Sequence, residues 1–123
     1  MGKCDIFDRV INFNYARNIA KKFNLKVEYE NIKEELQELL DAGSNSSMLV
    51  DALCDIIVFC IGALWKLGYT PSLAMEETLK EIESRNQDKE QEKDWFMNGA
   101  SGKWKKSKSQ TNMYTADYNK AKE

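Results

Sequence analysis

Apolar residues recur three and four positions apart over residues 5–85, which is the spacing of helices and not the alternation of strands. Turn residues separate these segments, such as Gly43, which can end a helix, and Pro71, which suits a first helical turn. The pattern therefore predicts an all-α protein with a four-helix core. The expected helices span residues 5–23, 29–42, 48–67 and 71–85.

The expected helix at 48–67 is apolar nearly all round, whereas the other three each have an apolar stripe. A helix with no polar face needs cover on every side. Three further helices in a chain of 123 residues can hardly supply it. We therefore expect a partner subunit and an oligomeric protein.

The composition becomes strongly polar at Asn86 and stays so to the end, with scattered aromatic residues. We expect a single domain over 1–123, with a helical core at about 5–86 and a Lys-rich, partly irregular tail at about 87–123. This tail is expected either to be a loose arm or to fold over a site or a neighbour.

The sequence contains no His, which excludes His-dependent triads and His-ligated zinc or haem. Its net charge of −2 gives no overall positive field, so duplex nucleic acid is not an expected partner. Three Cys without a CxxC pattern are typical of reduced thiols in a cytoplasmic protein. The polar start predicts no signal peptide. Ile56–Trp65, the longest apolar run, is short of the roughly 20 residues that span a bilayer, so no membrane is expected.

Two pairs of carboxylates stand on neighbouring expected helices. Glu35 and Glu38 are three residues apart, and Asp51 and Asp55 are four apart, so each pair shares one helix face. A short loop joins the two helices, so they are expected to pack antiparallel and to bring the pairs together. Four such carboxylates can hold Mg²⁺ or Mn²⁺, which prefer oxygen ligands. The pattern predicts metal-assisted hydrolysis of a phosphate anhydride.

Simpler explanations exist for three of these residues. Glu35 and Glu38 fit a solvated helix face, and Asp51 fits the first turn of a helix, where the dipole favours a negative charge. Asp55 lies in the second turn among apolar neighbours, where neither explanation applies.

The segments Glu34–Ala42 and Asp51–Phe59 resemble the all-α nucleoside triphosphate pyrophosphohydrolases, the MazG-like group. The segments Glu81–Arg85, Gly102–Lys106 and Tyr114–Tyr118 resemble the end of the fourth helix and the tail of its phage-encoded members. The signature of that group is ExxE on one helix and ExxD on the next. Glu35 and Glu38 match the ExxE, and Asp55 matches the Asp of the ExxD. The Glu position of the second motif falls on Ala52, and Asp51 stands one residue earlier.

This resemblance implies a four-helix core of the MazG-like type, built into a homodimer or a dimer of dimers. It implies hydrolysis of an NTP or dNTP to the monophosphate and pyrophosphate, by attack of metal-activated water on the α-phosphorus. Glu35, Glu38 and Asp55 would be the catalytic residues, and Asp51 would join them as a metal ligand. The implied location is the cytoplasm of a bacterial or phage-infected cell.

Cations and aromatic residues supply candidates for binding the rest of a nucleotide. Phosphate groups could meet the basic side chains Lys33, Arg85, Lys89, Lys103 and Lys106, although charge runs are commonly solvated surface. A base could be read by Asn12, Phe13 and Asn14. Core packing is the favoured interpretation of Phe13 and of Trp65.

Two alternative functions stay open. A phosphoribosyl-ATP pyrophosphohydrolase would use the same helical carboxylates on a different substrate. A non-catalytic helical adaptor that oligomerises would explain the apolar helix and the tail, although not Asp51 and Asp55 inside that helix.

Overall fold

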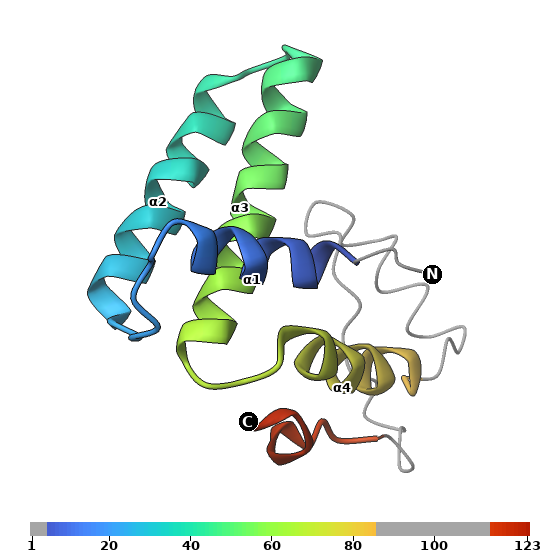
Figure 1. Ribbon diagram of the computed structural model, residues 1–123. Coiled ribbons are helices and arrows are strands. Elements are labelled where there is room, and N and C mark those ends of the chain that lie inside the picture. Colours follow the sequence, from blue (N-terminus) through green and yellow to red (C-terminus); the bar gives the residue numbers. More distant parts are fainter. Residues whose placement is uncertain (1–4, 86–113) are drawn as a thin grey trace. The chain divides into compact units, whose positions relative to one another are not determined.

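The computed structural model describes residues 5–85 and 114–123 (Figure 1). Over these ranges the chain forms four α-helices and a short 3-10 helix, η1, and no strand, which confirms the all-α prediction. The elements are α1 (Ile6–Ala16), α2 (Leu25–Asp41), α3 (Ser46–Lys66), α4 (Pro71–Glu83) and η1 (Tyr118–Ala121). The chain divides into two compact units, Met1–Ser72 with Lys122–Glu123, and Leu73–Ala121.

Three side-chain caps set where the first helices begin. Asp5 accepts a hydrogen bond from the Asp8 amide at 2.8 Å, Asn24 from the Val27 amide at 3.2 Å, and Asn45 from the Met48 amide at 3.1 Å. α2 therefore begins four residues before the expected position, at Leu25. The cap of α3 is Asn45, and not one of the two serines that follow it.

Left-handed residues end α1 and α3. Asn18 has φ 56°, so α1 ends at Ala16 and the expected extent to residue 23 is wrong. Gly68 has φ 95°, a conformation that side chains with a Cβ rarely adopt. The amides of Gly68 and Tyr69 then donate to the Trp65 and Leu64 carbonyls, both at 3.1 Å, and so close the end of α3.

In the first unit α2 and α3 run antiparallel as a hairpin, and α1 crosses α3 (Figure 1). Trp65 near the end of α3 is 1% exposed, and the Tyr15 ring of α1 meets it edge-on at 5.2 Å between centroids. Lys66 Nζ donates to Glu28 Oε2 at 3.1 Å. Glu28 is in the first turn of α2 and Lys66 in the last turn of α3, so each charge also complements a helix dipole.

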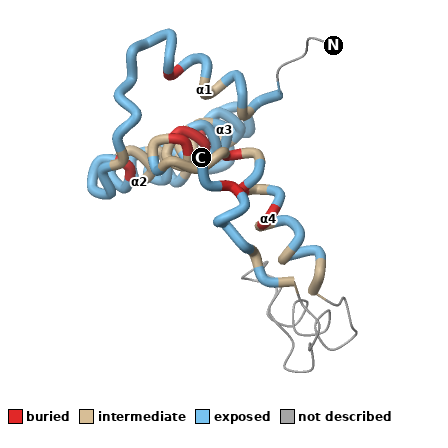
Figure 2. Tube along the Cα trace, turned by 60° about the horizontal axis from the view of Figure 1, so that its bottom comes forward, coloured by how far each residue is buried: buried red, intermediate tan, exposed pale blue. Residues whose placement is uncertain are grey.

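Much apolar surface of the first unit has no cover among the residues that the structure describes. Figure 2 shows exposed positions along most of α2 and α3. On α2, Leu40 is 74% exposed, and on α3, Val50 is 60% exposed. Their exposed large apolar neighbours on these two helices are Leu25, Val27, Tyr29, Leu36, Met48, Leu53, Ile57 and Val58.

α3 is the only helix in 5–85 that is long and apolar enough to cross a membrane. The mostly buried core helix of a soluble protein passes the same test of length and composition, whereas 17% of the window in α3 is buried. The apolar run Ile56–Trp65 is part of this helix, which spans 21 residues and also contains Asp51 and Asp55.

In the second unit the residues 114–121, called the C-terminal strap below, bind along α4 by polar contacts. Glu77 is 3% exposed, and its carboxylate accepts hydrogen bonds from the Tyr114 hydroxyl and, at 3.0 Å, from the Asp117 amide. Ser84 Oγ accepts from the Tyr114 amide at 2.8 Å, and Glu81 Oε1 from the Ala116 amide at 2.9 Å. This part of the expected tail therefore folds back on its own chain.

The strap contacts lower the pKa of Glu77 from 4.5 to about 2, chiefly through the Tyr114 hydroxyl and then the Asp117 amide. Because the folded pKa is depressed, the stabilisation is complete above about pH 4.5 and is lost as the pH falls toward 2.

We expect Glu77→Gln to lower the hydrogen-exchange protection of the Asp117 amide by about tenfold or more at neutral pH, because its bond to a charged acceptor is lost. The difference from the unmodified chain shrinks as the pH falls from 4.5 to 2. The exposed neighbour Glu76, changed to Gln, is the control. Equal protection in both variants would contradict this account of the strap.

Candidate metal centre

The α2–α3 hairpin brings Glu35, Glu38 and Asp55 into electrostatic contact. Glu35 and Glu38 lie one turn apart on α2, and Asp55 belongs to the facing helix α3. The pKa of Glu35 is raised above 4.5, first by burial, then by the charge of Glu38 and a side-chain hydrogen bond with Glu38, and then by the charge of Asp55. The charge of Glu34 also raises the pKa of Glu35, by a smaller amount. Three of the four carboxylates singled out in the sequence therefore form one group.

Glu35 carries an unsatisfied polar atom. Its Oε2 is buried, and no residue in the described ranges donates a hydrogen bond to it. A buried acceptor without a partner is costly, and more so when other carboxylates stand nearby. A divalent cation at this position would satisfy the oxygen and offset the repulsion, so the donor set fits Mg²⁺ or Mn²⁺.

The three carboxylates are not arranged around a common point as metal ligands would be. Over residues 5–85 and 114–123, no three acidic or thiol side chains are close enough together to hold a metal ion as they stand. Glu38 is exposed, and its side chain already interacts with that of Glu35 through a hydrogen bond. The metal site thus stays a prediction, and its best-supported ligands are Glu35, Glu38 and Asp55.

Asp51 has different surroundings from Asp55. It is exposed, and its charge is not among those that raise the pKa of Glu35. Its side chain lines a hollow of about 500 Å³ at the start of α3, together with Ser46, Ser47, Val50 and Cys54. α3 begins at Ser46 and has no acidic residue in its first turn, so the expectation that Asp51 fits the first turn of a helix is wrong.

Two of the candidate phosphate-binding cations lie in the described part of the chain. Lys33 is exposed on α2, with its Nζ 5.8 Å from the centroid of the Tyr29 ring. Arg85 follows α4 and pairs with Glu81 at 3.8 Å. The other three candidates, Lys89, Lys103 and Lys106, lie outside the described residues.

The base-binding candidates on α1 have three different environments. Asn14 is 7% exposed and lies against α3, where its Nδ2 is 3.4 Å from the position of a Cβ at Gly62. Asn12 is exposed. Phe13 is 50% exposed, so the prediction of core packing is wrong for this residue in the described part of the chain. The same prediction is confirmed for Trp65, which is 1% exposed. The Arg17 guanidinium lies 4.8 Å from the Phe13 centroid and covers one ring face.

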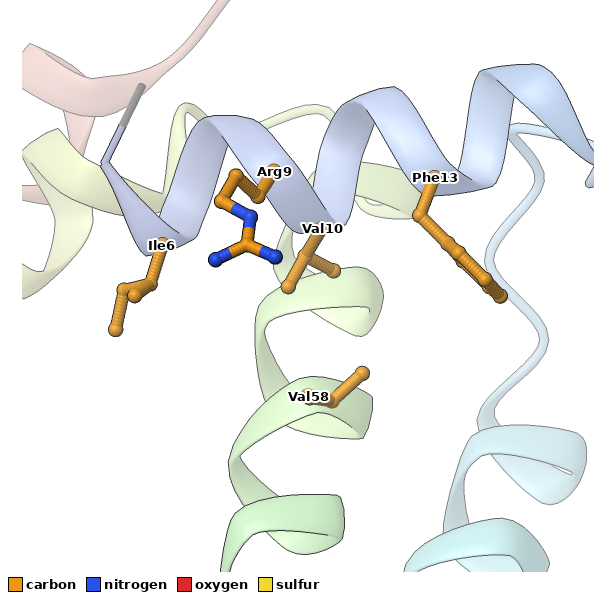
Figure 3. Close-up of a pocket in the computed structure, with 5 residues that line it drawn as sticks. All are labelled: Ile6, Arg9, Val10, Phe13 and Val58. Carbon is orange, nitrogen blue, oxygen red and sulfur yellow. The ribbon is translucent and has the colours of Figure 1, made fainter. Parts of the chain in front are cut away.

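Phe13 borders a hollow between α1 and α3 (Figure 3). The hollow has a volume of about 390 Å³ and is lined by Ile6, Arg9, Val10, Phe13 and Val58. Sequence reasoning missed Arg9, although its position three residues after Ile6 and four before Phe13 puts it on the same face of α1. That spacing was the signal that could have found it.

No protein-family model matches this chain, and neither a curated protein nor a solved structure matches it.

The raised pKa of Glu35 means that ionising this carboxyl costs stability as the pH rises above 4.5. We expect Glu35→Gln to raise the melting temperature at pH 7 in a chelator. This gain should disappear at pH values below 4.5, where the carboxyl is protonated in both the folded and the unfolded chain.

The same variant should lose the rise in melting temperature that millimolar Mg²⁺ or Mn²⁺ gives the unmodified chain by mass action. Glu30→Gln, an exposed acid on α2, is the matched control and should change neither quantity. A Glu35→Gln chain that melts lower in chelator, or that keeps its full response to the metal, would refute the proposed ligand.

Proposed function

We propose that this chain is a metal-dependent nucleoside triphosphate pyrophosphohydrolase of the all-α, MazG-like kind. The observation that carries the proposal is the buried, unpartnered Glu35 oxygen beside Glu38 and Asp55 on two facing helices. These residues are the ones that the resemblance of the sequence assigns to catalysis, and electrostatic contact among them is what such a site requires.

In the proposed site Glu35, Glu38 and Asp55 hold Mg²⁺ or Mn²⁺. When bound, the ion lowers the pKa of water and neutralises charge on the phosphates. A carboxylate oxygen of this group that the ion leaves uncoordinated would accept the proton released as water attacks the α-phosphorus. The new bond joins the water oxygen to that phosphorus. The bond from the phosphorus to the bridging oxygen breaks, and pyrophosphate leaves with the bond electrons.

The carboxylates supply no positive charge for the leaving pyrophosphate. We assign that task to Lys33, which is on the same helix as Glu35 and Glu38. The further candidates from the sequence are Arg85, Lys89, Lys103 and Lys106. Lysine meets phosphate as a point charge, and arginine as a two-pronged donor.

The proposed enzyme is a homodimer or a dimer of dimers. The support is the apolar surface of α2 and α3, on which Leu40, Val50 and Ile57 are all at least half exposed. Apolar patches of this kind on a soluble chain mark interaction surfaces. A second copy would cover α3, whose sequence has no polar face.

A panel of the eight common NTPs and dNTPs with Mg²⁺ or Mn²⁺ tests the function, if pyrophosphate and orthophosphate are measured separately. We expect pyrophosphate from one or a few of them. Turnover of phosphoribosyl-ATP alone would instead support the phosphoribosyl-ATP pyrophosphohydrolase. No turnover together with no thermal response to metal would support the adaptor.

Glu38→Ala and Asp55→Ala should each reduce the rate of pyrophosphate release by more than about 100-fold, because each removes a metal ligand. Both variants should fold, since each relieves repulsion between like charges. Glu30→Ala is the control and should keep the unmodified rate. Full activity in either ligand variant would contradict the assignment of the site.

A further inference from the structure

The hollow between α1 and α3 combines an apolar wall, an aromatic ring and one cation. Ile6, Val10 and Val58 supply the apolar wall, and Phe13 lies at one end (Figure 3). Figure 3 shows the Arg9 side chain on the side of α1 that faces the hollow, with its guanidinium between the side chains of Ile6 and Val10. Among the described residues, none forms an ion pair or a hydrogen bond with this guanidinium.

The hollow lies close to the candidate metal centre along α3. Val58, its α3 residue, comes three positions after Asp55, so the two side chains are neighbours on one helix face. A molecule that reached from the carboxylates along this face by one helical turn would enter the hollow. Its far end would have to be flat or apolar, and would have to carry hydrogen-bond acceptors for Arg9.

We propose that this hollow takes the nucleobase of the substrate and that Arg9 selects guanine. The inference rests on the proposed function and names the substrate class of that site. The Arg9 guanidinium is a donor-only fork that matches two adjacent acceptors, which guanine presents as O6 and N7. Adenine has an amino group where guanine has O6, so it leaves one arm of the fork unpaired. The Phe13 ring, held on one face by Arg17, gives the base an aromatic neighbour.

The charge and size of the hollow favour a base over the side chain of a second copy. A purely apolar contact between subunits would bury the Arg9 guanidinium beside Val10 and Ile6 without a partner, which is costly. A volume of about 390 Å³ also leaves room for a purine and water.

The test is binding of dGMP and dAMP without metal, followed by NMR of the Ile6, Val10 and Val58 methyl groups. We expect dGMP to shift these methyls and to bind about tenfold or more tightly than dAMP. Arg9→Gln should bring the two affinities within about threefold, mainly by weakening dGMP. Lys26→Gln, which removes an equal charge at an exposed position of α2, is the matched control and should leave the ratio unchanged.

Each contrary result would refute a different part of the proposal. Equal affinities for dGMP and dAMP in the unmodified chain, or an unchanged ratio in Arg9→Gln, would overturn the role of Arg9. Methyl shifts that depend on the protein concentration and not on the nucleotide would show that a second copy of the chain occupies the hollow. That result would overturn the proposal. If the chain binds dGMP selectively but hydrolyses no nucleotide, the proposed function would be refuted and the proposed base site would be retained.

Discussion

A carboxylate buried beside two others is the constraint on which the rest of the account depends. Ionisation of the Glu35 carboxyl lowers the stability of the folded chain. The Oε2 atom of Glu35 has no hydrogen-bond donor among the described residues. The hairpin is held at its other end, where Glu28 pairs with Lys66 and Trp65 is buried. These contacts hold α2 against α3 and so keep the three carboxylates on facing helices. The fold therefore keeps a negative group in place that a cation would satisfy.

The same hairpin leaves its apolar surface uncovered. α3 packs on α2 and α1, yet Val50, Leu53 and Ile57 stay about half exposed or more. α1 gives no full cover either, because it ends at Ala16 where Asn18 takes a left-handed conformation. The described part of one copy thus combines a group of neighbouring carboxylates with an apolar core that is only partly covered. For this reason we propose both a catalytic site and assembly with a second copy.

Helical periodicity was enough to predict the fold class, the four helices and the start of α4 at Pro71. It failed at boundaries decided by single side chains, such as the Asn45 cap and the left-handed Asn18. Spacing also predicted that Glu35, Glu38, Asp51 and Asp55 would meet, and the antiparallel hairpin brings the charges of Glu38 and Asp55, but not that of Asp51, to bear on Glu35. It could not show that Asp51 lines another hollow, that Phe13 is half exposed, or that Glu77 anchors the strap. Those outcomes depend on packing between segments distant in sequence.

The most direct measurement is NMR of the protein titrated with substoichiometric Mn²⁺, which broadens the signals of nuclei close to the bound ion. Our account predicts that the amides around Glu35 and Glu38 on α2 and around Asp55 on α3 broaden first, and that Asp55→Asn abolishes this effect. Broadening centred on other acidic residues, or equal broadening over the whole surface, would contradict a cation site in the hairpin.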